Sequence, residues 1–342
     1  MFKINLNKEE KFIINTLFSD KKITEHQITS LNFEKLIKIA SSHLILPSLY
    51  VKLKEKNYLQ FIPNELNIFL KKIYSINHSR NKELIAEIKE ISELFRTNKI
   101  SHVFLKGSSL VSEVFEEIGE RMVGDIDILV KEIDFESSIN LLKSIGYNSK
   151  TDLYFFNQKH YPRLLKKNKL FAVEIHNRAL KENKYVNIVY EDINQCKNAN
   201  NVNCPNNYSQ LEINIYNDQI NDNGYIKESF NFKSFYDTFM IVKKFNLKLN
   251  NIKKNKYTKN YLCYMYSLGI LTEKINDKHI YKKNFLRHNL KKKSNIYYKI
   301  DFFVLLVIMN FNIRLKQLYN LLINKEYRDY AIKKIINQNL LL

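Results

Sequence analysis

Residues Val103–Leu110 and Arg121–Val130 read VFLKGSSL and RMVGDIDILV, and this stretch decides the fold. The apolar runs Val103–Leu105 and Ile126–Val130 have the composition of buried strands. A Gly-Ser turn and a helix, Leu110–Ile118, are expected between them. The stretch therefore predicts a strand, a turn that opens a helix, and a second strand that starts with two aspartates one residue apart.

Those two aspartates, Asp125 and Asp127, are the first candidate site residues. Successive side chains of a strand alternate, so both face the same side while Ile126 and Ile128 face the core. Two adjacent carboxylates repel each other unless a cation lies between them. Mg²⁺ prefers oxygen ligands and usually arrives with substrate phosphates. For this motif alone, two solvated aspartates at a strand end are favoured; together with the turn that precedes it, the pair predicts a magnesium site.

The turn Lys106-Gly107-Ser108 joins a strand to a helix, which is where backbone N–H groups commonly bind phosphate. Gly107 permits close approach of the backbone, and Ser108 adds a hydroxyl donor. The alternative is an ordinary turn in which Ser108 or Ser109 caps the helix, and this is compatible with phosphate binding. For Lys106, a phosphate contact is open, but a solvated position at the strand end is favoured.

Glu174 is the third candidate carboxylate, in the strand-like segment Phe171–His176. It alternates with apolar residues, a pattern that by itself is typical of a solvent-facing side chain. If this strand lies beside the one with Asp125 and Asp127, Glu174 is placed to hold a metal or to act as general base on an acceptor hydroxyl.

The remaining chain is mostly helical by pattern. Two to four helices are expected between Lys8 and about Asn98, one of them starting after Pro63. A helix over Phe135–Ile145 is expected to end at Gly146. The other expected elements are a strand at Leu153–Asn157, a hairpin arm at His160–Leu170, a loop at Asn198–Asn207, helices at Phe232–Phe245, Tyr261–Leu271 and Ile300–Ile323, and an ambiguous segment at Leu211–Ile215.

Composition supports the same picture. The 342 residues include only 6 Gly and 4 Pro, too few for the many turns of a β-sandwich or barrel. We therefore predict an α+β fold, with a small mixed β-sheet core flanked by N-terminal and C-terminal helical regions. The expected parts are residues 1–98, the α/β core at 99–180, and residues 181–342.

The formal net charge of +20 fits an anionic partner such as a nucleotide, nucleic acid or a membrane surface. Lys, Asn and Ile are abundant along the whole chain, however, and a purely compositional origin of the charge is favoured. The lysine clusters at Lys253–Lys259 and Lys291–Lys293 leave nucleic-acid binding open as an alternative.

The three cysteines, Cys196, Cys204 and Cys263, are scattered and indicate neither a disulfide framework nor a zinc site. The first residues lack the apolar region of a signal peptide. The longest apolar run, Phe302–Met309, is far shorter than the roughly 20 residues needed to cross a bilayer. A cytoplasmic protein with no membrane span is expected.

A Gly-Ser turn, two aspartates on the next strand and an acidic residue on a third strand together resemble the DNA polymerase β-like nucleotidyltransferase superfamily. More narrowly, LKGSSL, ERMVGDIDILV, LLKSIGY and VEIH are similar to a bacterial group of uncharacterised nucleotidyltransferase family proteins. The stretches IASSHLILPSL (Ile39–Leu49) and SFYDTFMIVKK (Ser234–Lys244) also match that group. The resemblance covers about residues 33 to 250.

The resemblance implies a role for each matched residue. Gly107 and Ser108 would contact nucleotide phosphates, and Asp125 and Asp127 would bind metal. Glu174 stands where the group usually has Asp, so the carboxylate is kept with a longer reach. Arg121 matches an arginine of the group, and clamping a phosphate and pairing with an aspartate are equally open for it.

For four further residues a structural role is expected or favoured. His176 matches the group, and a packed, hydrogen-bonded histidine is favoured over a metal ligand. Asp237 is expected to be a structural partner on a helix. Base stacking is open for Phe156 and Tyr161, but core packing is favoured.

The activity implied is that of a nucleotidyltransferase dependent on Mg²⁺, with two ions expected. An acceptor hydroxyl would attack the α-phosphorus of an NTP such as ATP and release pyrophosphate. A small molecule or a protein is favoured as acceptor over RNA. The alternatives are a non-catalytic nucleotide-binding regulatory module and a nucleic-acid-binding protein; the presence of all three carboxylates favours the enzyme.

Overall fold

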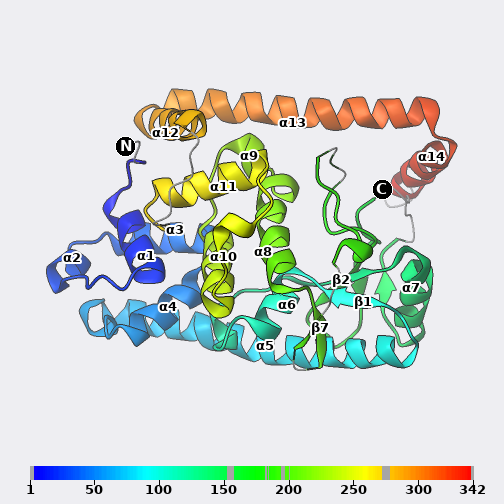
Figure 1. Cartoon of the computed structure of the whole chain (residues 1–342), viewed down its shortest axis with the longest axis horizontal. Helices are drawn as coiled ribbons and strands as arrows, with labels where there is room; N and C mark the ends of the chain where they lie inside the picture. The colour runs from blue at the N-terminus through cyan, green and yellow to red at the C-terminus, as the bar shows by residue number, and fades with distance from the viewer. Residues whose placement is uncertain are drawn as a thin grey trace.

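The computed structural model describes residues 4–151, 158–181, 183, 185–193, 197–199, 201–271 and 278–339 (Figure 1). It shows a small mixed sheet among many helices, which confirms the predicted α+β class. The strand expected at Leu153–Asn157 and the side chain of Phe156 lie outside the described residues.

The five-stranded sheet has the order β1-β2-β5-β4-β3. Strand β2 (Asp125–Val130) lies between β1 (His102–Phe104), to which it is antiparallel, and the central strand β5 (Ala172–His176), to which it is parallel. Strands β4 (Leu164–Leu165) and β3 (Asn148–Ser149) extend the sheet beyond β5 in antiparallel fashion. The hairpin expected between His160 and Leu170 is therefore present as β4 and its turn into β5.

One face of the sheet is covered by two helices, α5 (Asn64–Thr97) and α7 (Phe135–Ser144). Ile126 and Ile128 of β2 pack into the same apolar cluster as Ile88 of α5. Since strand side chains alternate, the carboxylates of β2 and β5 face the opposite side. On that side Leu129 packs with residues of α8 (Asn207–Tyr216).

The N-terminal region holds more helices than expected. Described residues 4–97 form five α-helices rather than two to four, so the predicted number was wrong. The helices are α1 (Lys8–Phe18), α2 (Glu25–Thr29), α3 (Phe33–Ser42), α4 (Leu46–Glu55) and α5. Thr24 and Asn32 cap the starts of α2 and α3, so this part of the chain forms short helices. A search for long apolar stripes does not detect helices of this length.

The last of these, α5, starts directly after Pro63 as predicted and is 34 residues long. It runs along the lower edge of the molecule in Figure 1. Leu66 and Leu70 in its first half pack with the N-terminal helices, whereas Leu84 and Phe95 in its second half pack under the sheet. One helix thus contributes to two apolar cores.

Two other sequence expectations are corrected. The predicted loop at Asn198–Asn207 is wrong, because it contains β6 (Lys197–Ala199) and β7 (Val202–Cys204), which pair as a hairpin. Val202 and Cys204 alternate with Asn203 and are buried, while Asn201 takes the left-handed turn conformation (φ 67°) that asparagine tolerates. The ambiguous segment Leu211–Ile215 lies within helix α8.

The C-terminal part is helical, as predicted. Its remaining helices are α9 (Gly224–Lys227), α10 (Phe232–Phe245), α11 (Lys256–Ser267), α12 (Lys278–Lys293), α13 (Asn295–Ile323) and α14 (Lys325–Asn339). Helices α8, α10 and α11 share one apolar cluster with the N-terminal helices. The domain limits at 98 and 180 stay predictions. Among the described helices, none combines the length and the apolar composition needed to cross a membrane.

Candidate active site

Three acidic side chains meet on the open face of the sheet. Strand β2 places Asp125 and Asp127 one residue apart, and its register with β5 sets Asp127 directly opposite Glu174. Asp127 and Glu174 are buried, and Asp125 is partly buried. The parallel β2–β5 pair therefore brings together the three carboxylates that the sequence analysis singled out.

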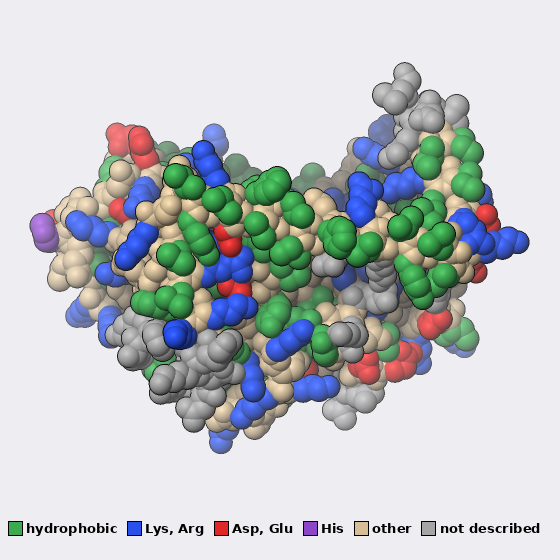
Figure 2. All heavy atoms as spheres, turned by 90° about the horizontal axis from the view of Figure 1, so that it is seen from above, with side chains coloured by type: hydrophobic (Ala, Val, Ile, Leu, Met, Phe, Trp, Pro, Cys, Tyr) green, Lys and Arg blue, Asp and Glu red, His purple; other side chains and the backbone are tan. Residues whose placement is uncertain are grey.

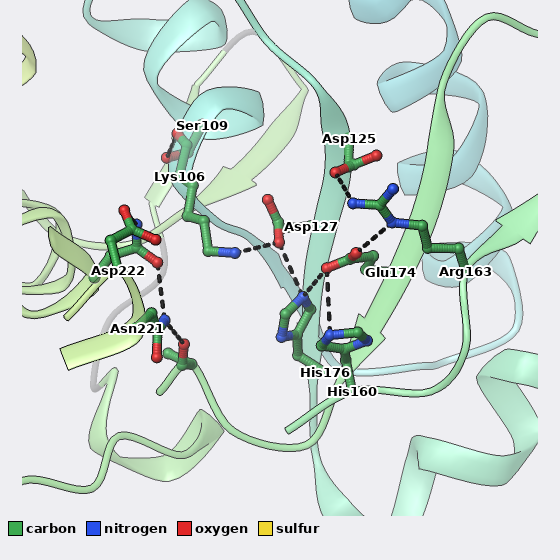
Figure 3. Close-up of polar contacts among 12 residues, drawn as sticks. Lys106, Ser109, Asp125, Asp127, His160, Arg163, Glu174, His176, Asn221 and Asp222 are labelled. Atoms are coloured by element: carbon green, nitrogen blue, oxygen red, sulfur yellow. Dashed lines mark hydrogen bonds and ion pairs between the residues drawn. The ribbon is translucent and has the colours of Figure 1, made fainter. Parts of the chain in front are cut away.

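Asp127 is held by two cationic or hydrogen-bonding partners (Figure 3). Lys106 Nζ lies 2.5 Å and His176 Nε2 2.9 Å from the same oxygen, Oδ1. Burial alone would raise the pKa of Asp127, but Lys106 and His176 outweigh it and hold this pKa far below its usual range. Because an ionised carboxylate only accepts, His176 donates through Nε2–H. His176 is thus a buried, hydrogen-bonded histidine beside the site, as expected.

Arg163 joins the other two carboxylates, and sequence reasoning missed it. Its Nε donates to Glu174 Oε1 and its Nη2 to Asp125 Oδ2, both at 2.9 Å (Figure 3). Burial opposes ionisation of Glu174, but the hydrogen bond with His176 is the main effect that lowers its pKa, to about 2. Burial raises the pKa of Asp125 despite Arg163. The β4–β5 pairing of Leu164 with Val173 brings Arg163 beside Glu174, so the register of the hairpin was the missing signal.

The turn before α6 (Lys106–Glu113) differs in detail from the expectation. The helix starts at Lys106 rather than near Leu110, so neither Ser108 nor Ser109 caps it. Lys106 has φ 50°, a left-handed conformation that costs a non-glycine residue about 1–2 kcal/mol. Ser108 is fully buried and is not among the residues that line the cleft described below. Gly107 does line that cleft.

The neighbours of Gly107 leave no room for a side chain at this position. A Cβ at this position would lie 2.5 Å from Arg121 Nη1 and 2.8 Å from Val123 Cγ1. We expect Gly107→Ala to lower the free energy of unfolding by about 1–3 kcal/mol, because packed neighbours must shift, and to weaken nucleotide binding. Gly124→Ala is the matched control, since a Cβ there meets nothing within 4 Å. Equal thermal denaturation and equal nucleotide affinity of the two variants would contradict the prediction.

Arg121 pairs with an aspartate, one of its two open alternatives. Its Nε and Nη2 donate to the two carboxylate oxygens of Asp237 on α10, both at 2.8 Å, and both residues are buried. The backbone carbonyl of Arg121 accepts hydrogen bonds from Asn77 and Asn81 of α5. Asp237 is thus a structural partner on a helix, as expected. Tyr161, also expected in the core, is buried in the cluster under the sheet.

A cleft of about 550 Å³ lies between the sheet and helices α8 and α10, lined by both Asp125 and Asp127. Its basic lining residues are Arg80, Lys106, Arg121, Lys159, Lys181 and Lys233. Burial and the charge of Lys106 lower the pKa of Lys159 to about 8, and the charge of Arg121 together with burial does the same for Lys233. No described carboxylate forms an ion pair with Lys159 or Lys233. Two crowded lysines that no described carboxylate pairs with, Lys159 and Lys233, indicate a cleft for a polyanion.

The carboxylates also suit a metal ion. Asp127, Glu174 and His176 each offer a ligand atom within 4.8 Å of the others. Within the described residues, Asp125 Oδ1 and Asp127 Oδ2 have no hydrogen-bond partner, and both residues line the cleft. The free oxygens of Asp125 and Asp127 are ligands of the type that Mg²⁺ prefers. The donor set therefore fits magnesium.

Comparison with known protein families identifies the family of this chain. A family model described as "Uncharacterised nucleotidyltransferase" matches residues 29–257, a range that includes the whole five-stranded sheet and α10. Searches of curated proteins and of solved structures each returned no match. With two thirds of its length matched, the chain belongs to this family of uncharacterised nucleotidyltransferases.

Proposed function

We propose that this protein transfers a nucleoside monophosphate from an NTP to an acceptor hydroxyl, with Mg²⁺ as cofactor and pyrophosphate as the released product. One observation carries the proposal: Asp125 and Asp127 line the same cleft as Gly107 at the start of α6. Carboxylates for a metal and a helix N-terminus for phosphates are thus within one cavity.

In this proposal Asp125 and Asp127 hold the metal through the oxygens that face the cleft. Bound Mg²⁺ would neutralise charge on the reacting phosphate. Glu174, with a pKa of about 2, is a weak base, so it suits metal binding better than proton abstraction. For Glu174 to reach a metal or an acceptor, Arg163 must leave it; the side chain of Arg163 is 60% exposed, so there is solvent for it to move into.

The triphosphate would lie along the basic side of the cleft. The N-terminus of α6 with Gly107 supplies backbone donors. Lys106 and Lys159 flank the carboxylates, and Lys233 stands beside Arg121 near the start of α10. A polyanion between these groups would relieve their mutual repulsion, which is a direct source of binding energy.

Lys233→Gln is expected to weaken NTP binding about tenfold, the effect of losing one charge-assisted contact of at least about 1.5 kcal/mol. In the wild-type protein affinity should fall as pH rises through about 8, where Lys233 loses its proton, and this fall should be smaller in the variant. Calorimetry with an α,β-methylene NTP analogue measures both effects. Lys82→Gln, at an exposed position on α5, is the control. Unchanged affinity in Lys233→Gln would exclude Lys233 from the phosphate site.

The acceptor is proposed to be a small molecule or a protein rather than RNA. Incubation with each labelled NTP, Mg²⁺ and a fractionated cell extract tests this, because label should enter the small-molecule or the protein fraction. Nucleotide binding without any labelled product would instead indicate a non-catalytic nucleotide-binding module. Strongly salt-dependent RNA or DNA binding without transfer would indicate a nucleic-acid-binding protein.

A further inference from the structure

Helix α13 exposes large apolar side chains along its whole length. It crosses the top of the molecule in Figure 1, in contact with α12 at one end and α14 at the other. Viewed from that side, Figure 2 shows hydrophobic side chains spread over the surface. Apolar side chains of α13 are exposed on more than one side of the helix, as Phe302 and Tyr319 show. Eight that are 48% to 72% exposed are here called the α13 stripe: Ile296, Ile300, Phe303, Val307, Phe311, Leu315, Leu318 and Leu322.

The α13 stripe forms a single face. At 100° per residue its eight side chains fall within an arc of about 120° and extend over about 39 Å of helix. The buried Leu305 lies outside this arc, so it does not interrupt the stripe. Arg314 also falls within the arc and donates a hydrogen bond to Gln317, which lies outside it.

The positions of the stripe are symmetric about residue 309. If two copies of α13 run antiparallel with residue 309 at the crossing point, each stripe residue meets another stripe residue. The pairs are Ile296 with Leu322, Ile300 with Leu318, Phe303 with Leu315, and Val307 with Phe311. Arg314 then meets Val304 rather than a second arginine. A surface that matches itself in this way is what a two-fold interface requires.

We propose that the α13 stripe is the interface of a homodimer in which two α13 helices pack antiparallel across a two-fold axis. A standard interface takes about 800 Å² from each partner, and eight exposed large side chains over about 39 Å of helix supply an area of that order. A membrane surface fits less well, since interfacial helices carry a polar face rich in Lys and Arg. Instead, the cations nearest α13 on α12, Arg287 and Lys291, are paired with Asp301.

Light scattering after gel filtration tests the proposal on the full chain. The wild type should have twice the 40.9 kDa mass of one chain at micromolar concentration. Val307→Glu/Phe311→Glu should reduce it to the monomer mass, with an unchanged circular dichroism spectrum. Phe302→Glu is the matched control on the opposite side of α13, where the side chain is 54% exposed, and it should stay dimeric. A monomeric wild type, or equal dissociation of both variants, would overturn the proposal.

Cross-linking tests the direction of the pair. In a Cys196→Ser background, a mixture of Ile296→Cys and Leu322→Cys chains should form a disulfide-linked heterodimer, whereas Ile296→Cys alone should not cross-link. Cys204 and Cys263 are buried and stay in place. Efficient cross-linking of Ile296→Cys with itself would indicate a parallel pair and contradict the antiparallel interface. A monomer that binds anionic vesicles would assign the stripe to lipid instead.

Discussion

The double substitution Asp125→Asn/Asp127→Asn is expected to abolish nucleotidyl transfer, with a loss of at least about 10³-fold, because charge stabilisation by a bound metal is worth several kcal/mol in the transition state. Both carboxylates line the cleft, and each has one oxygen without a described hydrogen-bond partner. Amides of the same size keep the packing of β2 but remove the negative charge that attracts Mg²⁺. The rate of label transfer from the preferred NTP measures the effect.

Two controls separate a catalytic loss from a folding loss. Asp20→Asn changes an exposed aspartate far from the sheet and should leave the rate unchanged. The double variant should still bind the metal-free NTP analogue, because Gly107 and Lys233 are untouched. Transfer at the wild-type rate by the double variant would show that these aspartates do not hold the catalytic metal.

Asp237→Ala is expected to lower the free energy of unfolding by about 3–5 kcal/mol, because it leaves Arg121 buried without its counter-ion. The repulsion would extend to Lys233, whose pKa is already lowered by the charge of Arg121. Through its ion pair with Arg121, Asp237 also joins α10 to the segment that leads into β2. Loss of this ion pair should therefore loosen the cleft. Urea denaturation followed by circular dichroism measures the change.

A double-mutant comparison identifies the cause. Arg121→Met/Asp237→Leu removes both charges and should be more stable than Asp237→Ala alone, since no unpaired ion is left. Asp222→Ala, at an exposed position of the same cleft, should change stability by less than about 0.5 kcal/mol. If Asp237→Ala and Asp222→Ala had the same free energy of unfolding, the Arg121–Asp237 pair would not stabilise the fold.

The central part of the site could be predicted from the sequence because it depends on residues that lie close together in the chain. Asp125 and Asp127 share a face by strand alternation, and Gly107 follows an apolar strand directly. Alternation also marked Glu174 on a later strand, and the β2–β5 register places it opposite Asp127. The α+β class followed equally from apolar periodicity and scarce Gly and Pro.

The residues that were missed depend on contacts between distant segments. Arg163 became part of the site only through the register of β4 on β5, and a lysine-rich hairpin has no feature that marks one cation in advance. Lys233 comes from α10, more than a hundred residues after Asp127. The β6–β7 hairpin was mistaken for a loop because its asparagines hide the alternation of Val202 and Cys204.

Helix α5 has a mechanical consequence for the cleft. Its 34 residues contain no proline or glycine, and hinges and sharp bends in helices occur chiefly at such residues or at local irregularities. Leu70 and Leu84 belong to different cores, yet an unbroken helical segment joins them. Helix α5 is therefore a stiff link between the core beneath the sheet and the core that contains α8 and α10, the helical wall of the cleft. Discrimination between nucleotides by size would then need no closing motion of the two walls.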